Sequence, residues 1–338
     1  MHHTESKPRW WHSDYNVREK IRFFHYRLVR PRERESFSIG RRLHYGTTVV
    51  NDIEPNFSLL ILGDYMPHPG LELRLASNLC ELIEDSDLVL LHIEGIMSEK
   101  KRLLALNHEY SLPMEVRRLF GTKVILNLVN NHASDFGKDA FLHQPVRWRK
   151  EGFEHLIWDQ SGEDLTHGIH FYAASYWCNQ RIDTVPRFDY HTLPQQTPNP
   201  DTFNIFLPHW GYEMELHPQA CQVEYAYHLL DNGWDAVIGS HPHCPQPMEL
   251  RESKPIVYSL GNFCYKNINP NHWGGRAIRL HFHCEPNLKP ILCSMESYFT
   301  LQTISKEELL ISLESSIDYK DLRADFRWSL SYFRDLLT

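Results

Sequence analysis

The chain has 338 residues, enough for one large or two modest domains with a sizeable core. Its 42% hydrophobic and 23% charged residues are ordinary for a globular protein, and its net charge of −8 argues against a chain-wide nucleic-acid surface. The 22 histidines are unusual and favour metal ligation or acid–base chemistry, whereas seven cysteines without a CxxC pair favour reduced thiols.

The beginning of the sequence lacks the apolar core of a secretory signal, and no run approaches the ~20 apolar residues of a membrane span. We therefore expect a cytoplasmic protein that does not bind nucleic acid.

Residues 1–56 are expected to form a basic, partly helical extension ahead of the main domain. Val17, Ile21, Phe24 and Leu28 have the spacing of one helix face, and arginines surround that face. Two interpretations remain open: a helix docked on the domain with solvated arginines, or a peripheral contact with an anionic surface or partner.

The main domain is expected to span residues 57–300 and to mix strands with helices. Apolar runs that predict buried strands occupy residues 57–62, 87–93, 123–129, 155–158, 169–174, 203–207, 236–238 and 255–260. Helical spacing is found over 71–85, in the second half of 101–121, over 135–151 and between 212 and 235. Alternation within 277–301 predicts an antiparallel pair of strands. Residues 301–338 are expected to add helices packed on the domain, at 306–316 and 319–337.

The stretch 203–243 predicts a parallel βαβ unit, because two short apolar runs are linked by a helical segment. The first run ends at His209 and the second leads into His241 and His243. Since parallel strands end on the same edge of a sheet, the three imidazoles should converge there.

Ligand-type side chains also follow the other predicted strands. The complete set that follows short apolar runs is Asp64, Glu94, Asn131, His132, His209, His241 and His243. If five strand ends meet at one sheet edge, these groups form one site of mixed oxygen and nitrogen donors. Such a set suits one or two divalent ions such as Mn²⁺, Fe²⁺ or Zn²⁺, which activate water near neutral pH.

Each of these residues also has a purely structural explanation. A single histidine after a strand is usually a hydrogen-bonded core or loop residue, Asp64 could cap the next helix, and Asn131 could serve a turn. The joint pattern, with His-Pro-His some 30 residues after His209, is harder to explain in this way and favours the metal interpretation.

Six short motifs occur in a characteristic order. They are GDYM (63–66), IEG (93–95), NNHASDFG (130–137), HWGYE (209–213), IGSHPH (238–243) and YSLGNF (258–263). Together they resemble the CapA family, the bacterial poly-gamma-glutamate capsule synthesis proteins. That family is similar to calcineurin-like metallophosphoesterases, so the resemblance implies an α/β fold with a β-sandwich flanked by helices.

The resemblance also implies roles for single residues. Asp64 and His243 would bind a first metal, with Glu94 bridging to a second. Asn131, His209 and His241 would hold that second metal. His132 would be the acid that protonates the leaving group or would stabilise the charge of the transition state, while Glu213 and Asn262 would support the ligands or contact the substrate.

The sequence departs from the family pattern near the first metal. Met66 occupies the place where metallophosphoesterases usually have a histidine, and His68 could reach in from the loop instead. His92 stands where family members usually have asparagine, and it could be an extra ligand or support one, because it shares a strand face with Glu94.

Two functions therefore remain open. The first is a metal-dependent hydrolase, related to poly-gamma-glutamate capsule synthesis, that acts on a phosphoester or a gamma-glutamyl amide of a small molecule or polymer. The second is a non-catalytic polymer-binding or assembly protein that keeps the fold and a structural metal.

Overall fold

A computed structural model describes residues 18, 19, 21, 46–67, 70–100, 105–121, 123–164, 167–180, 182–215, 217–265, 274–305 and 308–314. Most of the basic extension, His68 and residues 315–338 lie outside these ranges, so the expectations made for them stay predictions. The part of the extension that is described after residue 45 includes strand β1 (Gly46–Val49), which pairs with the main sheet.

The larger sheet contains ten strands and includes most of the predicted amino-terminal strands. Its order is β3 (Glu72–Leu75), β18 (Glu308–Glu314), β17 (Ile291–Ile304), β16 (Gly274–His283), β2 (Phe57–Met66), β4 (Leu88–Ile93), β7 (Val124–Asn127) and β8 (Leu156–Ile157). β1 joins at β17, and β15 (Asn262–Tyr265) joins at β2. The predicted antiparallel pair is confirmed as β16 and β17.

The second sheet contains six strands. Its order is β13 (Met248–Arg251), β14 (Lys254–Val257), β12 (Ala236–Ile238), β11 (Phe203–His209), β10 (Ile169–Ser175) and β9 (Glu163–Asp164). β11 and β12 are parallel and are linked by α6 (Ala220–Asp231), which confirms the predicted βαβ unit. A small third sheet pairs β5 (Ile96–Met97) with β6 (Asn107–His108).

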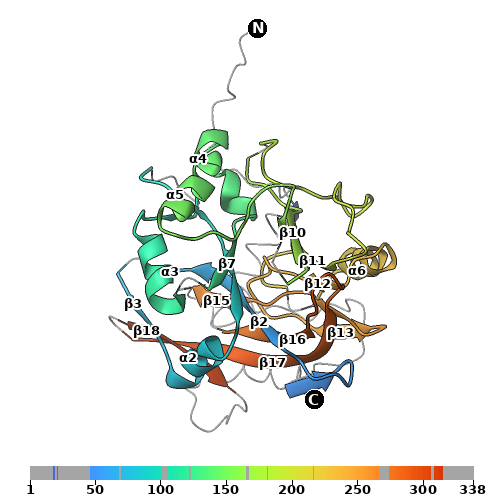
Figure 1. Ribbon diagram of the computed structural model, residues 1–338. Helices are drawn as coiled ribbons and strands as arrows, with labels where there is room; N and C mark the ends of the chain where they lie inside the picture. The colour runs from blue at the N-terminus through green and yellow to red at the C-terminus, as the bar shows by residue number, and fades with distance from the viewer. Residues whose placement is uncertain are drawn as a thin grey trace.

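The two large sheets pack face to face because alternate residues of their strands are apolar on the inner side. Ile61 and Leu59 of β2 share a buried cluster with Ile205 and Leu207 of β11. Figure 1 shows α2 (Ser77–Glu84) and α3 (Leu112–Phe120) on one side of the molecule and α6 on the other. The result is a layered α/β arrangement with helices outside two sheets.

Three local expectations are wrong. The helix expected at 71–85 is strand β3 followed by the shorter α2. The helix expected at 306–316 is strand β18 over the described residues 308–314. The helix expected at 135–151 is divided into α4 (Lys138–Leu142) and α5 (Gln144–Lys150), and the 3-10 helix η1 (Asn131–Ser134) precedes them. Pro145 lies in the first turn of α5, because proline is tolerated there but cannot continue a preceding helix.

The expectation of a single sheet edge is also wrong. β2, β4 and β7 belong to the ten-stranded sheet, whereas β11 and β12 belong to the six-stranded sheet. The strand ends that carry the predicted ligands therefore face one another across the junction of two sheets.

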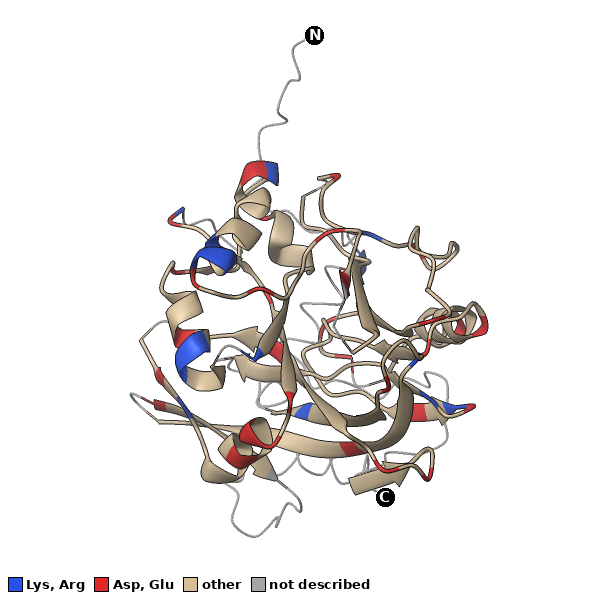
Figure 2. Cartoon of the chain, viewed as in Figure 1, with Lys and Arg blue, Asp and Glu red and all other residues tan. Residues whose placement is uncertain are grey.

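Other general features are consistent with an ordinary globular body. All seven cysteines lie within the described ranges, and none of them forms a disulfide. Acidic and basic side chains are interspersed over the described part of the chain, as Figure 2 shows. Among the described residues, none of the helices combines the length and apolar character needed to cross a membrane.

Candidate metal centre

The predicted ligands come from five segments and meet in the interior. Asp64 lies within β2, Glu94 directly follows β4, and Asn131 opens η1 after β7. His209 is the last residue of β11, and the loop after β12 carries His241 and His243. All six side chains are buried, so the structure brings together the residues that the sequence pattern singled out.

The first group of donors contains Glu94, His209 and His241, whose ligand atoms lie within 4.8 Å of one another. Nε2 of His209 is 3.0 Å from Oδ1 of Asn131, 3.1 Å from Nδ1 of His241 and 3.9 Å from Oε1 of Glu94. Four atoms with lone pairs thus converge on one point. The ring of His209 is oriented by Ser240, whose hydroxyl lies 2.9 Å from Nδ1.

The second group contains Asp64, Glu94 and His243. Nδ1 of His243 lies 3.6 Å from Oδ2 of Asp64 and 3.5 Å from Oε2 of Glu94. Oδ1 of Asn262 lies 3.0 Å from the same nitrogen, so Asn262 contacts a predicted ligand, as expected for a supporting residue. Glu94 is common to both groups, and this division has the composition that the family resemblance implies for two ions.

The environment of the carboxylates fits a bound cation. Among the residues that the structure describes, Oδ1 of Asp64 and both carboxylate oxygens of Glu94 are buried without a hydrogen-bond partner. Taking a carboxylate out of water without compensating partners costs several kcal/mol, so such oxygens need a positive charge beside them. The buried His, Glu and Asp side chains of these two groups could therefore hold a metal ion.

The pKa values of the imidazoles support the same fit. Burial and the neighbouring imidazoles hold the pKa of His209 and of His241 well below the usual value, so both rings are neutral, the form that binds metals. Burial also raises the pKa of Glu94 to about 8. At His243 burial acts to lower the pKa, but Glu94 and Asp64 outweigh it and raise it to about 10. Near neutral pH the proton on His243 therefore supplies the positive charge beside Asp64 and Glu94, and a bound cation would take the place of that proton.

His132 lies at the edge of the centre, with its two ring nitrogens in different surroundings. Nε2 is 4.0 Å from Oε1 of Glu94, whereas Nδ1 is 2.7 Å from Oδ2 of Asp135. Asn179 holds this pair, because its amide nitrogen donates to Oδ1 of Asp135 at 2.8 Å. Burial acts to lower the pKa of His132, but Asp135 and Glu94 raise it to about 9, so the ring is a proton donor near neutral pH.

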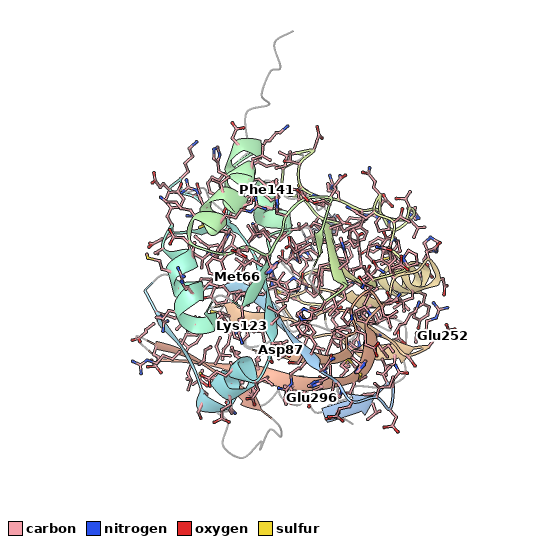
Figure 3. The ribbon with its side chains drawn as sticks, in the orientation of Figure 1. Met66, Asp87, Lys123, Phe141, Glu252 and Glu296 are labelled. Atoms are coloured by element: carbon pink, nitrogen blue, oxygen red, sulfur yellow. The ribbon has the colours of Figure 1, made fainter. Side chains whose placement is uncertain are left out.

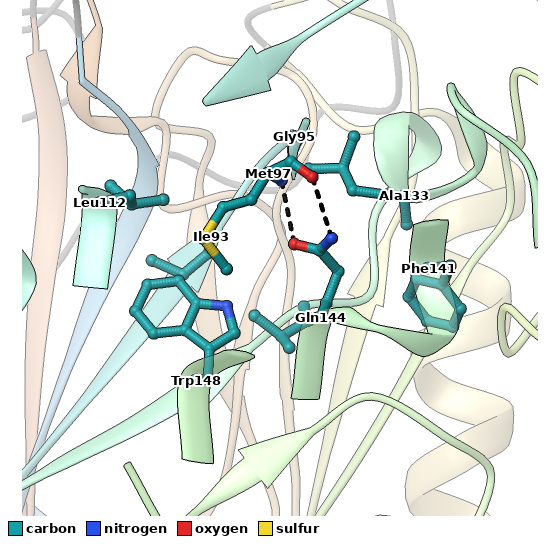
Figure 4. A pocket seen from close by; sticks show the side chains of 10 residues that line it. Ile93, Gly95, Met97, Leu112, Ala133, Phe141, Gln144 and Trp148 are labelled. Atoms are coloured by element: carbon teal, nitrogen blue, oxygen red, sulfur yellow. Dashed lines mark hydrogen bonds between the residues drawn. The ribbon is translucent and has the colours of Figure 1, made fainter. Parts of the chain in front are cut away.

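The side chain of Gln144 fixes the backbone of the turn that follows Glu94. Gln144 of α5 accepts from the backbone N–H of Met97 at 2.9 Å and donates to its carbonyl at 3.1 Å, as Figure 4 shows. The cavity beside this contact measures about 10 Å³, room for one water at most. Gly95 has φ +101°, and a Cβ there would lie 2.6 Å from Nε2 of His108, so only glycine fits the turn.

The remaining predicted residues lie outside the two groups or outside the described ranges. Oδ1 of Asn127 accepts from the N–H of Val129, so the amide nitrogen of Asn127 donates to Nδ1 of His92 at 3.0 Å. His92 is not a member of either donor group, and among the described residues its buried Nε2 has no hydrogen-bond partner. Glu213 is half-buried, and its charge contributes to raising the pKa of His132 and of His243. Met66 is buried at the end of β2 (Figure 3).

Sequence reasoning missed three residues that orient this site: Ser240, Asp135 and Asn179. Asp135 could have been found, because it lies three residues after His132 in the same motif. Asn179 follows β10 in a segment whose sequence offered no signal, and only the fold brings it to Asp135.

Comparisons with known proteins agree with the motifs. The model of the family described as "Bacterial capsule synthesis protein PGA_cap" matches residues 195–267. A protein named PGA biosynthesis protein CapA, from Bacillus subtilis, is 27% identical over 163 residues, which cover 42% of each chain. The capsule biosynthesis protein CapA of Bacillus anthracis is 39% identical over 163 residues, covering 42% of this chain and 40% of that protein.

A third relative, from Mycobacterium tuberculosis, is named a probable polyglutamine synthesis accessory protein and is 35% identical over 63 residues, 19% of this chain and 17% of its own. The matched regions thus span at most about two fifths of the length of these curated relatives. Over these matched regions the chain is similar in sequence to bacterial capsule synthesis proteins of the CapA type, the family that its motifs resemble.

Proposed function

We propose that this protein is a divalent-metal-dependent hydrolase of the calcineurin-like metallophosphoesterase type, related to capsule or poly-gamma-glutamate synthesis. Its substrate would be a phosphoester or a gamma-glutamyl amide. The observation that carries the proposal is the pair of buried carboxyl groups, Asp64 and Glu94, whose unpartnered oxygens lie among the imidazoles of the two donor groups. Two face-to-face sheets with outer helices support the fold assignment.

The donor set fits one or two ions of Mn, Fe or Zn. Asp64 and His243 would hold one ion, Asn131, His209 and His241 would hold another, and Glu94 would contact both. When bound, such ions polarise the scissile group and lower the pKa of water to near neutrality. Ser240 and Asn262 would keep the rings of His209 and His243 in the orientation that ligation needs.

His132 is assigned the role of the general acid. Its Nδ1–H donates to Asp135, which leaves Nε2–H directed toward the side of the centre where Glu94 lies. A leaving group there would take the proton from Nε2 while Asp135 stabilises the ring. Asn179 fixes the carboxylate of Asp135 and therefore the orientation of the ring.

The alternative is a binding or assembly protein for the polymer, with a structural metal and no turnover. The relatives' names favour it in one respect, since one of them describes an accessory role in synthesis. Met66, at the place of a usual metal-binding histidine, is the feature of this chain that weakens the first ion.

The test begins with metal content. Protein purified without added metal or chelator is analysed by elemental mass spectrometry as wild type, His241→Ala and the matched control His191→Ala, an exposed histidine away from the centre. We expect one to two equivalents of metal in the wild type and the control and a clear loss in His241→Ala. Absence of metal from all three proteins, even after loading, would overturn the metal proposal.

Turnover is measured next on the metal-loaded protein with aryl phosphomonoesters, aryl phosphodiesters and gamma-glutamyl amides. Loss of turnover in His132→Ala with metal content unchanged would support the hydrolase and its general acid. Metal binding without turnover on any of these substrates would favour the binding or assembly protein.

A further inference from the structure

A separate cavity of about 160 Å³ lies between the end of β2, the end of β6 and the start of α3. It is lined by Pro67, Gly70, Leu71, Leu112 and four polar residues, His108, Glu109, Ser111 and Glu115. A water-sized group needs roughly 10–15 Å³ of such space, so the cavity admits a fragment of several non-hydrogen atoms.

The polar atoms that face this cavity are mostly hydrogen-bond acceptors. His108 is 6% exposed, and its Nε2 is 2.6 Å from the carbonyl oxygen of Glu94. Because a carbonyl can only accept, Nε2 carries the hydrogen, and Nδ1 of the neutral ring is an acceptor. Within the described residues Nδ1 has no hydrogen-bond partner, although the ring is more than nine-tenths buried and lines the cavity.

Within the described ranges, the two carboxylates of the cavity have no basic side chain as an ion-pair partner. Glu115 accepts from the hydroxyl of Tyr65 at 2.5 Å, and among the described residues neither Glu109 nor Glu115 forms an ion pair. The two arginines of α3 donate elsewhere, Arg117 to the carbonyl of Glu151 at 3.1 Å and Arg118 to the carbonyl of Leu73 at 2.9 Å. The cavity therefore offers negative charge and hydrogen-bond acceptors beside the apolar side chains of Pro67, Leu71 and Leu112.

An anion is not favoured here, although α3 begins at the cavity. The N–H of Leu112 donates to the carbonyl of Glu109 at 3.2 Å, and that of Met114 to the carbonyl of Ser111 at 3.0 Å. Pro113, between them, has no N–H to offer. The first amides of the helix are thus occupied, and the helix end does not act as an anion site.

A bare metal ion is not favoured either. Within the described ranges, donors close enough to share one ion occur in the two groups of the metal centre, and the cavity's donors are not among them. Acceptors beside apolar side chains suit an organic cation whose alkyl part contacts those side chains and whose N–H groups donate to the acceptors.

We propose that this cavity binds an alkylammonium group, such as the end of a short aliphatic amine or of a lysyl side chain. His108 links the cavity to the metal centre, since its ring contacts the backbone of Glu94. If the proposed hydrolase function holds, the cavity is the subsite for an amine-bearing part of its substrate. The binding of the amine itself does not depend on turnover.

The test is a direct binding measurement on the full chain, by calorimetry or by ligand-observed NMR, with n-butylammonium and with Nα-acetyl-lysine amide as probes. The neutral isostere n-butanol controls for apolar binding. We expect saturable binding of the amines, weakened about tenfold by Glu115→Gln, because the charge-assisted hydrogen bond is lost while Tyr65 keeps an acceptor. Tighter binding of the lysine derivative than of butylammonium would identify a peptidyl source of the amine.

Two further variants keep the outcome interpretable. Glu109→Gln changes an exposed residue of the rim without touching the core and should also weaken binding, whereas Glu224→Gln, an exposed glutamate on α6, should not. Equal affinity for butanol, unchanged binding in both rim variants, or no saturable binding would overturn the proposal. Amine binding in a protein without turnover would leave this site in place while the hydrolase proposal falls.

Discussion

Gly63 offers the sharpest test of how the fold builds the metal centre. A Cβ at this position would lie 2.2 Å from the carbonyl oxygen of Gly261 and 3.2 Å from the backbone nitrogen of Phe263. Real Cβ contacts are rarely shorter than 3.0 Å, so β2 and the chain before β15 must separate by at least 3.0 minus 2.2, or 0.8 Å. β2 is paired with β16 and β4 as well, so it cannot move aside freely.

We therefore expect Gly63→Ala to lower the free energy of unfolding by about 2–4 kcal/mol. Overpacking of a tight interior costs about 1–3 kcal/mol, and losing the hydrogen bond from the N–H of Asp64 to Gly261 adds roughly 1 kcal/mol. The shift also displaces Asp64, whose Oδ2 receives the N–H of His241 at 3.2 Å. Metal–oxygen bonds tolerate only a few tenths of an ångström, so metal content should fall as well.

The assay is urea denaturation with metal content measured on the same samples. Gly121→Ala is the control, because Gly121 has φ +70° but nothing within 4 Å of a new Cβ, so it adds backbone strain far from any clash. The control should lose stability yet retain its metal. A Gly63→Ala protein that loses less than about 1 kcal/mol and keeps its full metal content would refute this account of the site.

Three other predictions follow from the same structure. Asp135→Asn should lower the pKa of His132 from about 9, because the effect of burial then dominates, and it should also reduce turnover. A histidine NMR titration measures the shift, and an unchanged pKa would contradict the pairing of His132 with Asp135. Phe206→Ala removes a fully buried ring between β11 and α6 and should cost about 3–5 kcal/mol in thermal unfolding, a loss under 1 kcal/mol being inconsistent with that packing. Burial acts to raise the pKa of Glu296, but Arg279 and the other hydrogen-bond partners outweigh it and lower this pKa in the folded protein. The stability that the carboxylate adds is therefore fully present above the pKa that Glu296 has in the unfolded chain. It is lost as the pH falls through the lower pKa of the folded protein. Glu296→Gln should therefore destabilise by less than about 1 kcal/mol at pH 7 and by nothing near pH 3, as pH-dependent denaturation can check.

Local sequence patterns predicted the strands that carry the site because those strands are short, apolar and fully buried. β2, β4, β7, β11 and β12 all lie within or overlap the predicted runs. The polar residues at their ends were therefore placed correctly relative to each strand. Their assignment to a single sheet failed, because the sequence of a buried strand does not tell which sheet it joins.

The two segments wrongly predicted as helices are partners of each other. β3 pairs with β18 in parallel, with Leu73 beside Leu309 and Leu75 beside Ile311, although the two strands are more than 230 residues apart. Each segment has apolar residues that fit either a helix face or one face of a strand. The pairing of β3 with β18 favours the strand over the helix in both segments, and local periodicity cannot detect a pairing between distant parts of the chain.

The sequence also could not fix the roles of histidines that differ only in their surroundings. His92 and His209 both belong to β-strands, but Asn127 contacts the first, while the second faces Asn131 and His241. Those partners come from other strands and loops, so the distinction appears only when the fold is known.

The position of the candidate centre has a mechanical consequence. Asp64, Glu94 and Asn131 are anchored to the ten-stranded sheet, and His209, His241 and His243 to the six-stranded sheet. A cation held by both sets would act as a cross-link between the two halves of the fold, as a disulfide does between distant segments of a chain. Heat or denaturant would then have to separate the sheets and release the ion in one step. Removal of the ion by a chelator should weaken the packing between the two sheets before it disturbs either sheet alone.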